Sequence, residues 1–269
     1  MATTDEFTLS GPAVGSRELL RTGADKLIDR TGSLHGLHAL TCQVARREEM
    51  FIPMNVSFTW PLAAAAALAA GCQHDIHTPF PGGLIELEAN PIPEQTAGPY
   101  GETMTSMTNS NEYDHVYGRG FVGADPATVW AAIHDPDAMA AKCTTDDQVI
   151  NPDTEPDYEL SFSIDYTVHN LVTVTWSDAW RFGVLAGTDD APARALIKHQ
   201  KVDGSSYIKR SEGTIEITPT ADDPATTEIS IVEHLDSLGG STDTVLKGVQ
   251  FNYDAMVAVS HGQPIPACP

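Results

Sequence analysis

The chain has 269 residues, and its 37 Asp and Glu side chains outnumber its 15 Lys and Arg side chains, which gives a formal net charge of −22. A surface of this charge repels phosphate groups, so nucleic acid is excluded as a partner, and so is docking on anionic lipid headgroups. We interpret the charge as a solvated surface suited to a salty habitat, where ions screen the self-repulsion. An acidic face that binds a basic protein partner is the alternative.

A short apolar, Ala-rich run that ends at Cys72 is the most specific signal in the first part of the chain. It is too short for a membrane span, which needs ~20 apolar residues, and it has the length of a signal-peptide core. Its end, Leu68-Ala-Ala-Gly-Cys72, resembles a bacterial lipobox, in which small residues precede a cysteine that is lipidated. Leu68 stands one position earlier than the bulky residue of that pattern, and the basic residues Arg46 and Arg47 lie far upstream.

The lipobox resemblance predicts a signal peptide over residues 50–72 and lipidation of Cys72. It implies an exported protein, a periplasmic or outer-membrane lipoprotein of a bacterium, that contacts the membrane through the lipid on Cys72. Residues 1–49 are then a non-structural leader, or they reflect a wrongly assigned start codon. An ordinary membrane anchor and a buried Ala-rich helix are the alternatives for the same run.

Residues 73–112 are expected to form a flexible tether. They are rich in Pro and Gly at 77–83 and contain two further prolines at 90–95, and residues 103–111 are Ser, Thr, Asn and Met without periodicity. Such a stretch buries too little apolar surface to offset the entropy lost when it is ordered.

The folded part begins with a strand and two short helices. The strand is expected over 115–122. Asp125 can cap the helix that follows, and Pro126 stands in its first turn, where the missing N–H costs nothing. The first helix is expected over 127–134, and the second short helix is expected to run to Lys142.

Strict alternation of apolar and polar residues then predicts antiparallel strands with one wet face, at 158–168, 172–184, 194–202, 206–218 and 227–238. A last helix is capped by Ser241 and ends at Gly262. The predicted fold class is α+β: a helix-grip fold over 113–262, with a curved antiparallel sheet of about six to seven strands around the long C-terminal helix and two short helices after strand 1. Residues 263–269 are a C-terminal tail.

Two regions of this domain resemble the START/Bet v 1-like (SRPBCC) superfamily. One is Ala124-Asp-Pro-Ala-Thr-Val-Trp130 at the first helix, and the other comprises Gly213–Pro219 and Thr226–Val232, where that superfamily has its last two strands. The resemblance rests on the order of elements and on pattern, and it covers the domain from Tyr113 to Gly262. It implies a cavity between the sheet and the long helix that takes lipids, polyketides, hormones or other apolar molecules.

The same resemblance implies a disulfide bond. In the resembled fold the two short helices lie against the end of the long helix, which brings Cys143 toward Cys268. With Cys72 lipidated, these two hold the remaining thiols in an oxidising compartment, so we expect them to be bonded.

The residues expected to line the cavity are aromatic or apolar, apart from two ionisable groups: Trp130, Phe162, Tyr166, Trp176, Asp178, Trp180, Phe182, His199, Val249, Tyr253 and Met256. Inside the cavity, Asp178 would be a candidate acid or base with a raised pKa, but a β-bulge that turns it outward is the favoured interpretation. His199 would be a proton shuttle inside the cavity, but a wet position at a strand edge is favoured.

No pattern in the sequence predicts a cofactor, a metal site or a catalytic motif. The ten His residues are scattered without HxH or HExxH spacing, and neither a GxSxG turn nor a phosphate loop is present. The predicted function is a lipid-anchored, non-enzymatic carrier or sensor of an apolar small molecule. A cyclase/aromatase-like enzyme and a protein-interaction module with a filled core are the alternatives.

Overall fold

The computed structural model describes residues 75–139, 143–169 and 171–268. The predicted leader, the signal peptide and Cys72 lie outside the described residues, and so does the end of the second short helix at Lys142. No helix of the described part is long and apolar enough to cross a bilayer.

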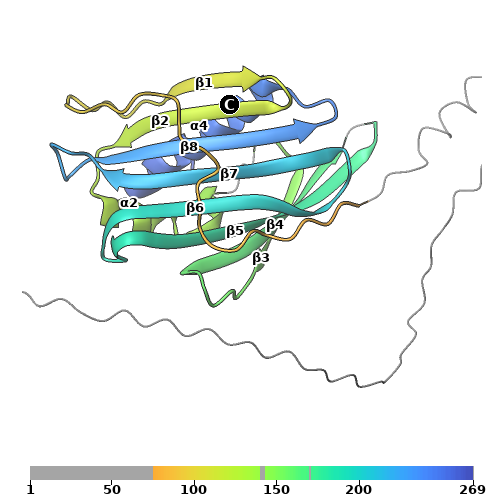
Figure 1. Cartoon of the computed structure of the whole chain (residues 1–269), viewed down its shortest axis with the longest axis horizontal. Helices are drawn as coiled ribbons and strands as arrows, with labels where there is room; N and C mark the ends of the chain where they lie inside the picture. Colours follow the sequence, from red (N-terminus) through yellow and green to blue (C-terminus); the bar gives the residue numbers. More distant parts are fainter. Residues whose placement is uncertain (1–74, 140–142, 170, 269) are drawn as a thin grey trace, which may run out of the picture. The chain divides into compact units, whose positions relative to one another are not determined.

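Eight antiparallel strands form one sheet in the order β1-β2-β8-β7-β6-β5-β4-β3 (Figure 1). Their bounds are β1 Thr105–Ser110, β2 Asp114–Val122, β3 Asp147–Pro152, β4 Leu160–His169, β5 Thr173–Thr188, β6 Ala191–Gly204, β7 Ile208–Pro219 and β8 Thr227–Ser237. Strands β3 to β8 follow one another as a meander, and β2 closes the order beside β8. Antiparallel sheets commonly have one buried and one wet face, which explains why the alternating patterns could be read from the sequence.

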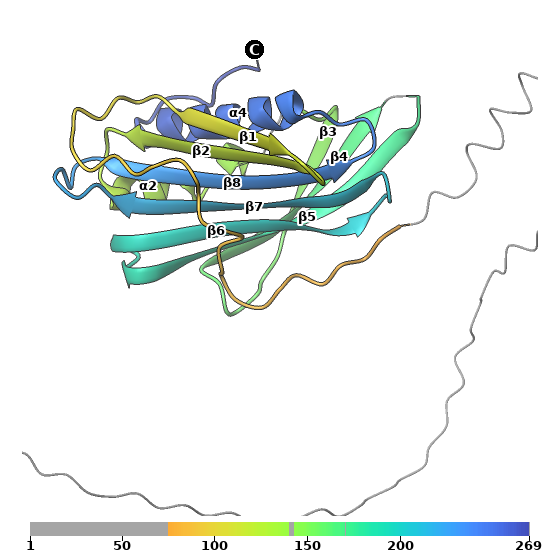
Figure 2. The same ribbon diagram turned by 45° about the horizontal axis from the view of Figure 1, so that its top comes forward.

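Three helices accompany the sheet: α2 (Pro126–Ile133) and α3 (Pro136–Met139) follow β2, and α4 (Thr242–Ser260) ends the domain. Both predicted caps are confirmed, because Asp125 accepts a hydrogen bond from the Thr128 N–H and Ser241 from the Thr244 N–H. Figure 2 shows α4 lying across one face of the sheet. This face is called the inner face below, and the opposite one the outer face.

The hydrophobic core fills the space between the inner face, α2 and α4. Alternate residues of each strand point inward, as Ile229 and Ile231 do on β8 and Ile215 and Ile217 on β7. This matches the predicted period of two, and the long helix is where the pattern placed it. The helix-grip architecture is therefore present.

Two strands were not predicted, and both are edge strands. Strand β1 is exposed along its whole length, so nothing in its sequence alternates. Strand β3, at the other edge, is only partly buried. They raise the strand count from the predicted six or seven to eight.

The predicted flexible tether is wrong from Asp75 onward. Residues 75–104, called the strap below, cross the outer face of the sheet before β1 begins (Figure 1). The side-chain amide of Asn90 donates to the Gly118 carbonyl oxygen at 2.8 Å and to Ser230 Oγ at 3.0 Å, and the buried side chain of Ile92 packs on the sheet. A few side chains thus hold a Pro-rich segment in place without periodic structure.

Cys143 and Cys268 are joined by a disulfide bond, with their Cα atoms 5.3 Å apart. This is the pair that the superfamily resemblance implied. The bond ties the segment before β3 to the tail that follows α4.

Candidate functional site

A cavity of about 300 Å³ lies between the inner face of the sheet and α4. Six of the predicted cavity residues line it: Tyr166, Trp176, Asp178, Trp180, His199 and Val249. The other five pack in the solid part of the core: Trp130, Phe162, Phe182, Tyr253 and Met256. Because the aromatic side chains leave this space open, the alternative of a completely filled core is wrong for the described part of the chain.

A glycine lets two ionisable side chains of the cavity meet across an intervening strand. His199 of β6 is paired in register with Gly213 of β7, and Gly213 is paired with Glu233 of β8. His199 Nε2 lies 2.8 Å from Glu233 Oε2. A Cβ atom at position 213 would lie 2.2 Å from both of these atoms, so glycine is what leaves room for the pair.

Asp178 joins this pair from β5. The expected irregularity is present as a register shift between Ser177 and Asp178, but the side chain is not turned out to solvent: Asp178 is 3% exposed. Ser211 Oγ donates to Asp178 Oδ2 at 3.0 Å, and His199 Nδ1 lies 3.9 Å from the same oxygen. The outward orientation favoured from the sequence is therefore wrong, because partners inside the domain compensate for burial of the carboxyl group.

His199 is also buried, and the favoured wet-edge position is wrong. Strand β6 lies within the sheet, between β5 and β7. The indole of Trp180 stacks on the imidazole with the ring centroids 4.3 Å apart. The imidazole is therefore held between an aromatic ring and two carboxyl groups.

Burial and neighbouring charges raise the pKa values of both groups. Burial raises the pKa of Asp178 to about 7, although His199 and the Ser211 hydroxyl act in the opposite direction. Burial lowers the pKa of His199, but Glu233 and Asp178 outweigh that effect, so this pKa is raised. Near neutral pH, Asp178 can therefore donate or accept a proton at the cavity wall, beside an imidazole that favours its charged form.

Several polar atoms of the cavity wall make no hydrogen bond within the described residues. His199 Nδ1, Asp178 Oδ1 and Asn252 Oδ1 are buried and make no hydrogen bond there, although all three residues line the cavity. Buried polar groups are almost always paired in folded proteins. These atoms are consequently the points at which a bound molecule or water would be held.

Where β8 continues into α4, the cavity opens to solvent. Leu238, Gly239, Gly240 and Thr244 belong to its lining and are exposed; this opening is called the mouth below. Leu238 places an exposed apolar side chain at this entrance.

The sequence reasoning missed Glu233, Ser211 and Asn252 as lining residues. A signal for Glu233 existed, because it has the same parity along its strand as the core residues Ile229 and Ile231. Ser211 likewise shares parity with Ile215. Because Glu233 is an acidic residue on the apolar face of a predicted strand, it could have been identified as a candidate cavity residue.

The raised pKa of Asp178 predicts a stability that falls as the pH rises. A carboxyl group whose pKa moves from 3.8 to about 7 on folding binds more protons in the folded state between those values, so the free energy of unfolding drops across that range. Denaturant unfolding of the wild type and of D178N, from about pH 4 to about pH 8, measures this. The wild type should lose stability relative to D178N by a few kcal/mol, at most about 1.4 kcal/mol per pH unit.

The charged groups that face Asp178 are His199, Glu233 and Lys201, and all three are present in both proteins. The difference between the wild type and D178N therefore reports Asp178 together with its coupling to these groups. A difference between the two proteins that stays constant over the whole pH range would contradict the assignment.

No protein-family model and no curated protein sequence matches the chain. Solved structures similar to it include the aromatase/cyclase ZhuI from Streptomyces sp. R1128, with 16% sequence identity, coverage of 55% of this chain and 91% of that chain, and a TM-score of 0.37. The lipid transfer and protein localization domain of human StarD13 is 9% identical over 77% of this chain and 98% of that chain, with a TM-score of 0.38. Ara h 8.0201 is 10% identical over 60% of this chain and all of that chain, with a TM-score of 0.35. The helix-grip description stands on the sheet order and on α4 themselves.

Proposed function

We propose that the cavity binds a small, largely apolar molecule that carries one hydroxyl or carbonyl group. The observation that carries the proposal is the composition of the wall: aromatic and aliphatic side chains are its largest group, and its ionisable side chains, Asp178, His199 and Glu233, form a single cluster. Hydroxyl and amide side chains such as Ser211 and Asn252 complete the lining. Ligand cavities are typically apolar with a few convergent polar groups that set orientation. His199 Nδ1 and Asp178 Oδ1, which make no hydrogen bond within the described residues, supply one donor or acceptor each for the polar group of the ligand.

The cavity volume limits the size of the ligand. About 300 Å³ is at the lower end of the range for small-molecule pockets, roughly 300–1,000 Å³. A compound with one or two rings or a short acyl chain fits this volume better than a complete phospholipid does.

Native mass spectrometry of the full chain, purified gently from a lipid-rich host, tests ligand binding. We expect an additional mass that organic extraction removes and identifies. Gly248 of α4 lines the cavity, and a Cβ there would make an ordinary contact, 3.5 Å from Thr144 Cγ2. Replacement of Gly248 by Leu is therefore expected to keep the fold and to fill part of the cavity, which abolishes the additional mass.

The matched control is K247L, which places the same side chain on the exposed neighbour in the same helix. K247L should keep the ligand. A wild type that stays bare after incubation with lipid extract, or a G248L variant that binds as the wild type does, would contradict the proposal.

Acid–base catalysis on the bound molecule is the second candidate function, and the buried Asp178–His199 arrangement is the observation that favours it. An acid with a pKa of about 7 beside a carbonyl group could move a proton in a cyclisation or a dehydration. The same extraction distinguishes the two functions. A carrier yields one compound from the wild type and from D178N, whereas an enzyme yields product from the wild type and unconverted substrate from D178N.

We further propose that the protein is exported and is anchored to a membrane by a lipid on Cys72. The lipobox-like sequence before Cys72 and the Cys143–Cys268 disulfide support this, since disulfides persist in oxidising compartments. Detergent phase partition of the full chain and of C72A, made in a bacterial host, tests the anchor. Partition of both proteins into the aqueous phase would refute it.

A further inference from the structure

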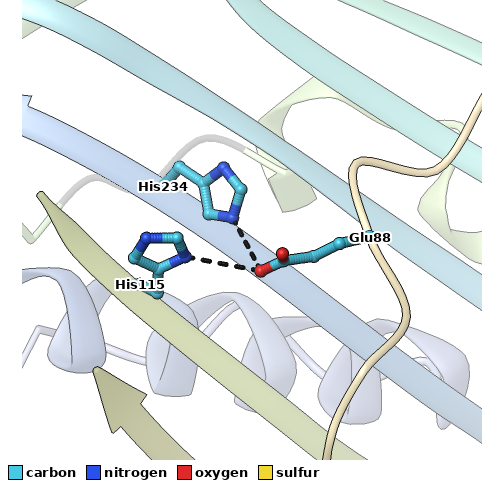
Figure 3. A group of neighbouring side chains, drawn as sticks. All are labelled: Glu88, His115 and His234. Carbon is cyan, nitrogen blue, oxygen red and sulfur yellow. Dashed lines mark hydrogen bonds and ion pairs between the residues drawn. The ribbon is translucent and has the colours of Figure 1, made fainter. Parts of the chain in front are cut away.

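Three side chains from distant parts of the chain converge on the outer face of the sheet, away from the cavity (Figure 3). They are Glu88 of the strap, His115 of β2 and His234 of β8. Glu88 Oε1 lies 3.1 Å from His234 Nε2 and 3.4 Å from His115 Nδ1. One ligand atom from each of the three residues can be chosen so that all lie within 4.8 Å of one another.

The sheet fixes the relative positions of the two imidazoles. His115 and His234 are directly opposite each other in the pairing of β2 with β8, and His234 is opposite Glu212 in the pairing of β8 with β7. His115, His234 and Glu212 therefore form one row across β2, β8 and β7. The strap then lays Glu88 over the row, so the cluster is assembled by backbone pairing and by the docking of the strap.

A second set of contacts orients the converging groups. His234 Nδ1 lies 3.2 Å from Glu212 Oε1, and this oxygen also accepts a hydrogen bond from Arg210 Nη1 at 2.8 Å. With the Glu212 carboxylate accepting a hydrogen bond from Nδ1, the other nitrogen, Nε2, faces Glu88 and is free to bind a metal ion once it loses its proton. The Tyr117 hydroxyl donates to Glu88 Oε1 at 2.5 Å. Outer partners of this kind are what metal-binding histidines and carboxylates typically have.

We propose that Glu88, His115 and His234 bind a divalent transition-metal ion, with Zn²⁺ the best match, and that water completes the coordination. Two imidazole nitrogens and a carboxylate oxygen suit Zn²⁺, whereas Mg²⁺ and Ca²⁺ prefer oxygen donors alone. Ligand atoms ~2.0–2.2 Å from a tetrahedral Zn²⁺ lie about 3.3–3.6 Å from one another. The observed separations of 3.1 and 3.4 Å from Glu88 Oε1 are close to that spacing.

The local charge also suits a divalent cation. Glu88 and Glu212 place two carboxylates at the cluster, against the single guanidinium of Arg210, which is held over the ring of Tyr113 with its Cζ 4.5 Å from the centroid. The metal would join the strap to β2 and β8. No spacing in the sequence predicted this site, because its ligands come from three separate segments.

Two rival explanations define the experiment. The cluster could be a hydrogen-bonded clamp that holds the strap without metal, and an acidic chain with a net charge of −22 could adsorb cations unspecifically. The full chain is therefore stripped with a chelator and titrated with Zn²⁺ by calorimetry at high salt, which suppresses adsorption. Co²⁺ serves as a second probe, because its visible absorption is much stronger when the ion has four or five ligands than when it has six.

The proposal expects one equivalent of Zn²⁺ that is lost in E88Q, H115Q and H234Q. The matched control is H261Q, which breaks another His–Glu contact, from His261 Nε2 to Glu102 Oε1 at 2.6 Å, and should keep the site. Zn²⁺ should also raise the midpoint of thermal unfolding in the wild type and in H261Q, but not in E88Q.

Zn²⁺ binding that persists unchanged in E88Q and H115Q would overturn the site, and so would equal binding of Ca²⁺. A wild type that binds no Zn²⁺ would leave the clamp as the explanation. Should the buried H234Q fail to fold, the more exposed Glu88 and His115 decide the question, since their replacement disturbs less packing. Ligand binding in the cavity is read separately, so failure of one proposal does not affect the other.

Discussion

Replacement of Gly213 by Ala is expected to separate His199 from Glu233, to lower the free energy of unfolding by about 1–3 kcal/mol and to abolish ligand binding. The added methyl group would lie 2.2 Å from both Glu233 Oε2 and His199 Nε2. The imidazole of His199 cannot yield easily because it is stacked on Trp180, so the Glu233 carboxylate would have to turn away from it. The polar end of the cavity would lose its geometry.

Denaturant unfolding and native mass spectrometry of G213A measure the two effects. Gly82 in the strap offers the matched control, since a Cβ there would have no atom within 4 Å. We expect G82A to change the free energy of unfolding by less than about 0.5 kcal/mol, as surface substitutions usually do, and to keep the ligand. Equal stability of G213A and G82A would mean that the His199–Glu233 contact contributes nothing measurable to the free energy of unfolding.

Removal of the disulfide in a C143S/C268S double variant is expected to lower the free energy of unfolding by about 2–5 kcal/mol. The bond closes a loop between residues that are 125 positions apart, so its loss returns much conformational freedom to the unfolded chain. It also releases the segment that carries Thr144 and Thr145, both of which line the cavity. Weaker ligand binding should therefore accompany the lower stability.

Unfolding without reductant, followed by peptide mass mapping, measures this effect. In the full chain made without processing at Cys72, C42S removes a cysteine that is not part of the bond, and it should behave as the wild type does. Alkylation of Cys143 or Cys268 in the native wild type without prior reduction would contradict the bond itself, whatever the stability of the variants.

The fold was largely readable from the sequence because most strands have one wet face and one buried face. Strand β4 alternates along nearly its whole length, and its bounds agree with the prediction to within two residues. Strand β1 has no buried face at all, so periodicity could not reveal it. The strap was misinterpreted for a related reason: its attachment depends on a few side chains such as Asn90 and Ile92, not on a repeating pattern.

The cavity was predictable in kind but not in its polar chemistry. Trp176 and Trp180 were expected at the wall and are there. Asp178 and His199 were assigned to solvent because a single buried ionisable group is costly. Interactions with partners offset that cost, but the partners of these two groups could not be identified from the sequence. Glu233 approaches His199 from a different strand, across Gly213. Sequence spacing carries no information about such a contact.

The strap begins close to the mouth of the cavity. Asp75 forms a bridge with Ser205 in the turn between β6 and β7, and the carbonyl oxygen of Tyr207, a lining residue two positions further, accepts a hydrogen bond from Leu238 at the mouth. Cys72 precedes Asp75 by three residues, which span at most about 11 Å. If Cys72 carries the lipid proposed above, this short connection keeps the mouth near the bilayer, which shortens the path of an apolar molecule between membrane and cavity.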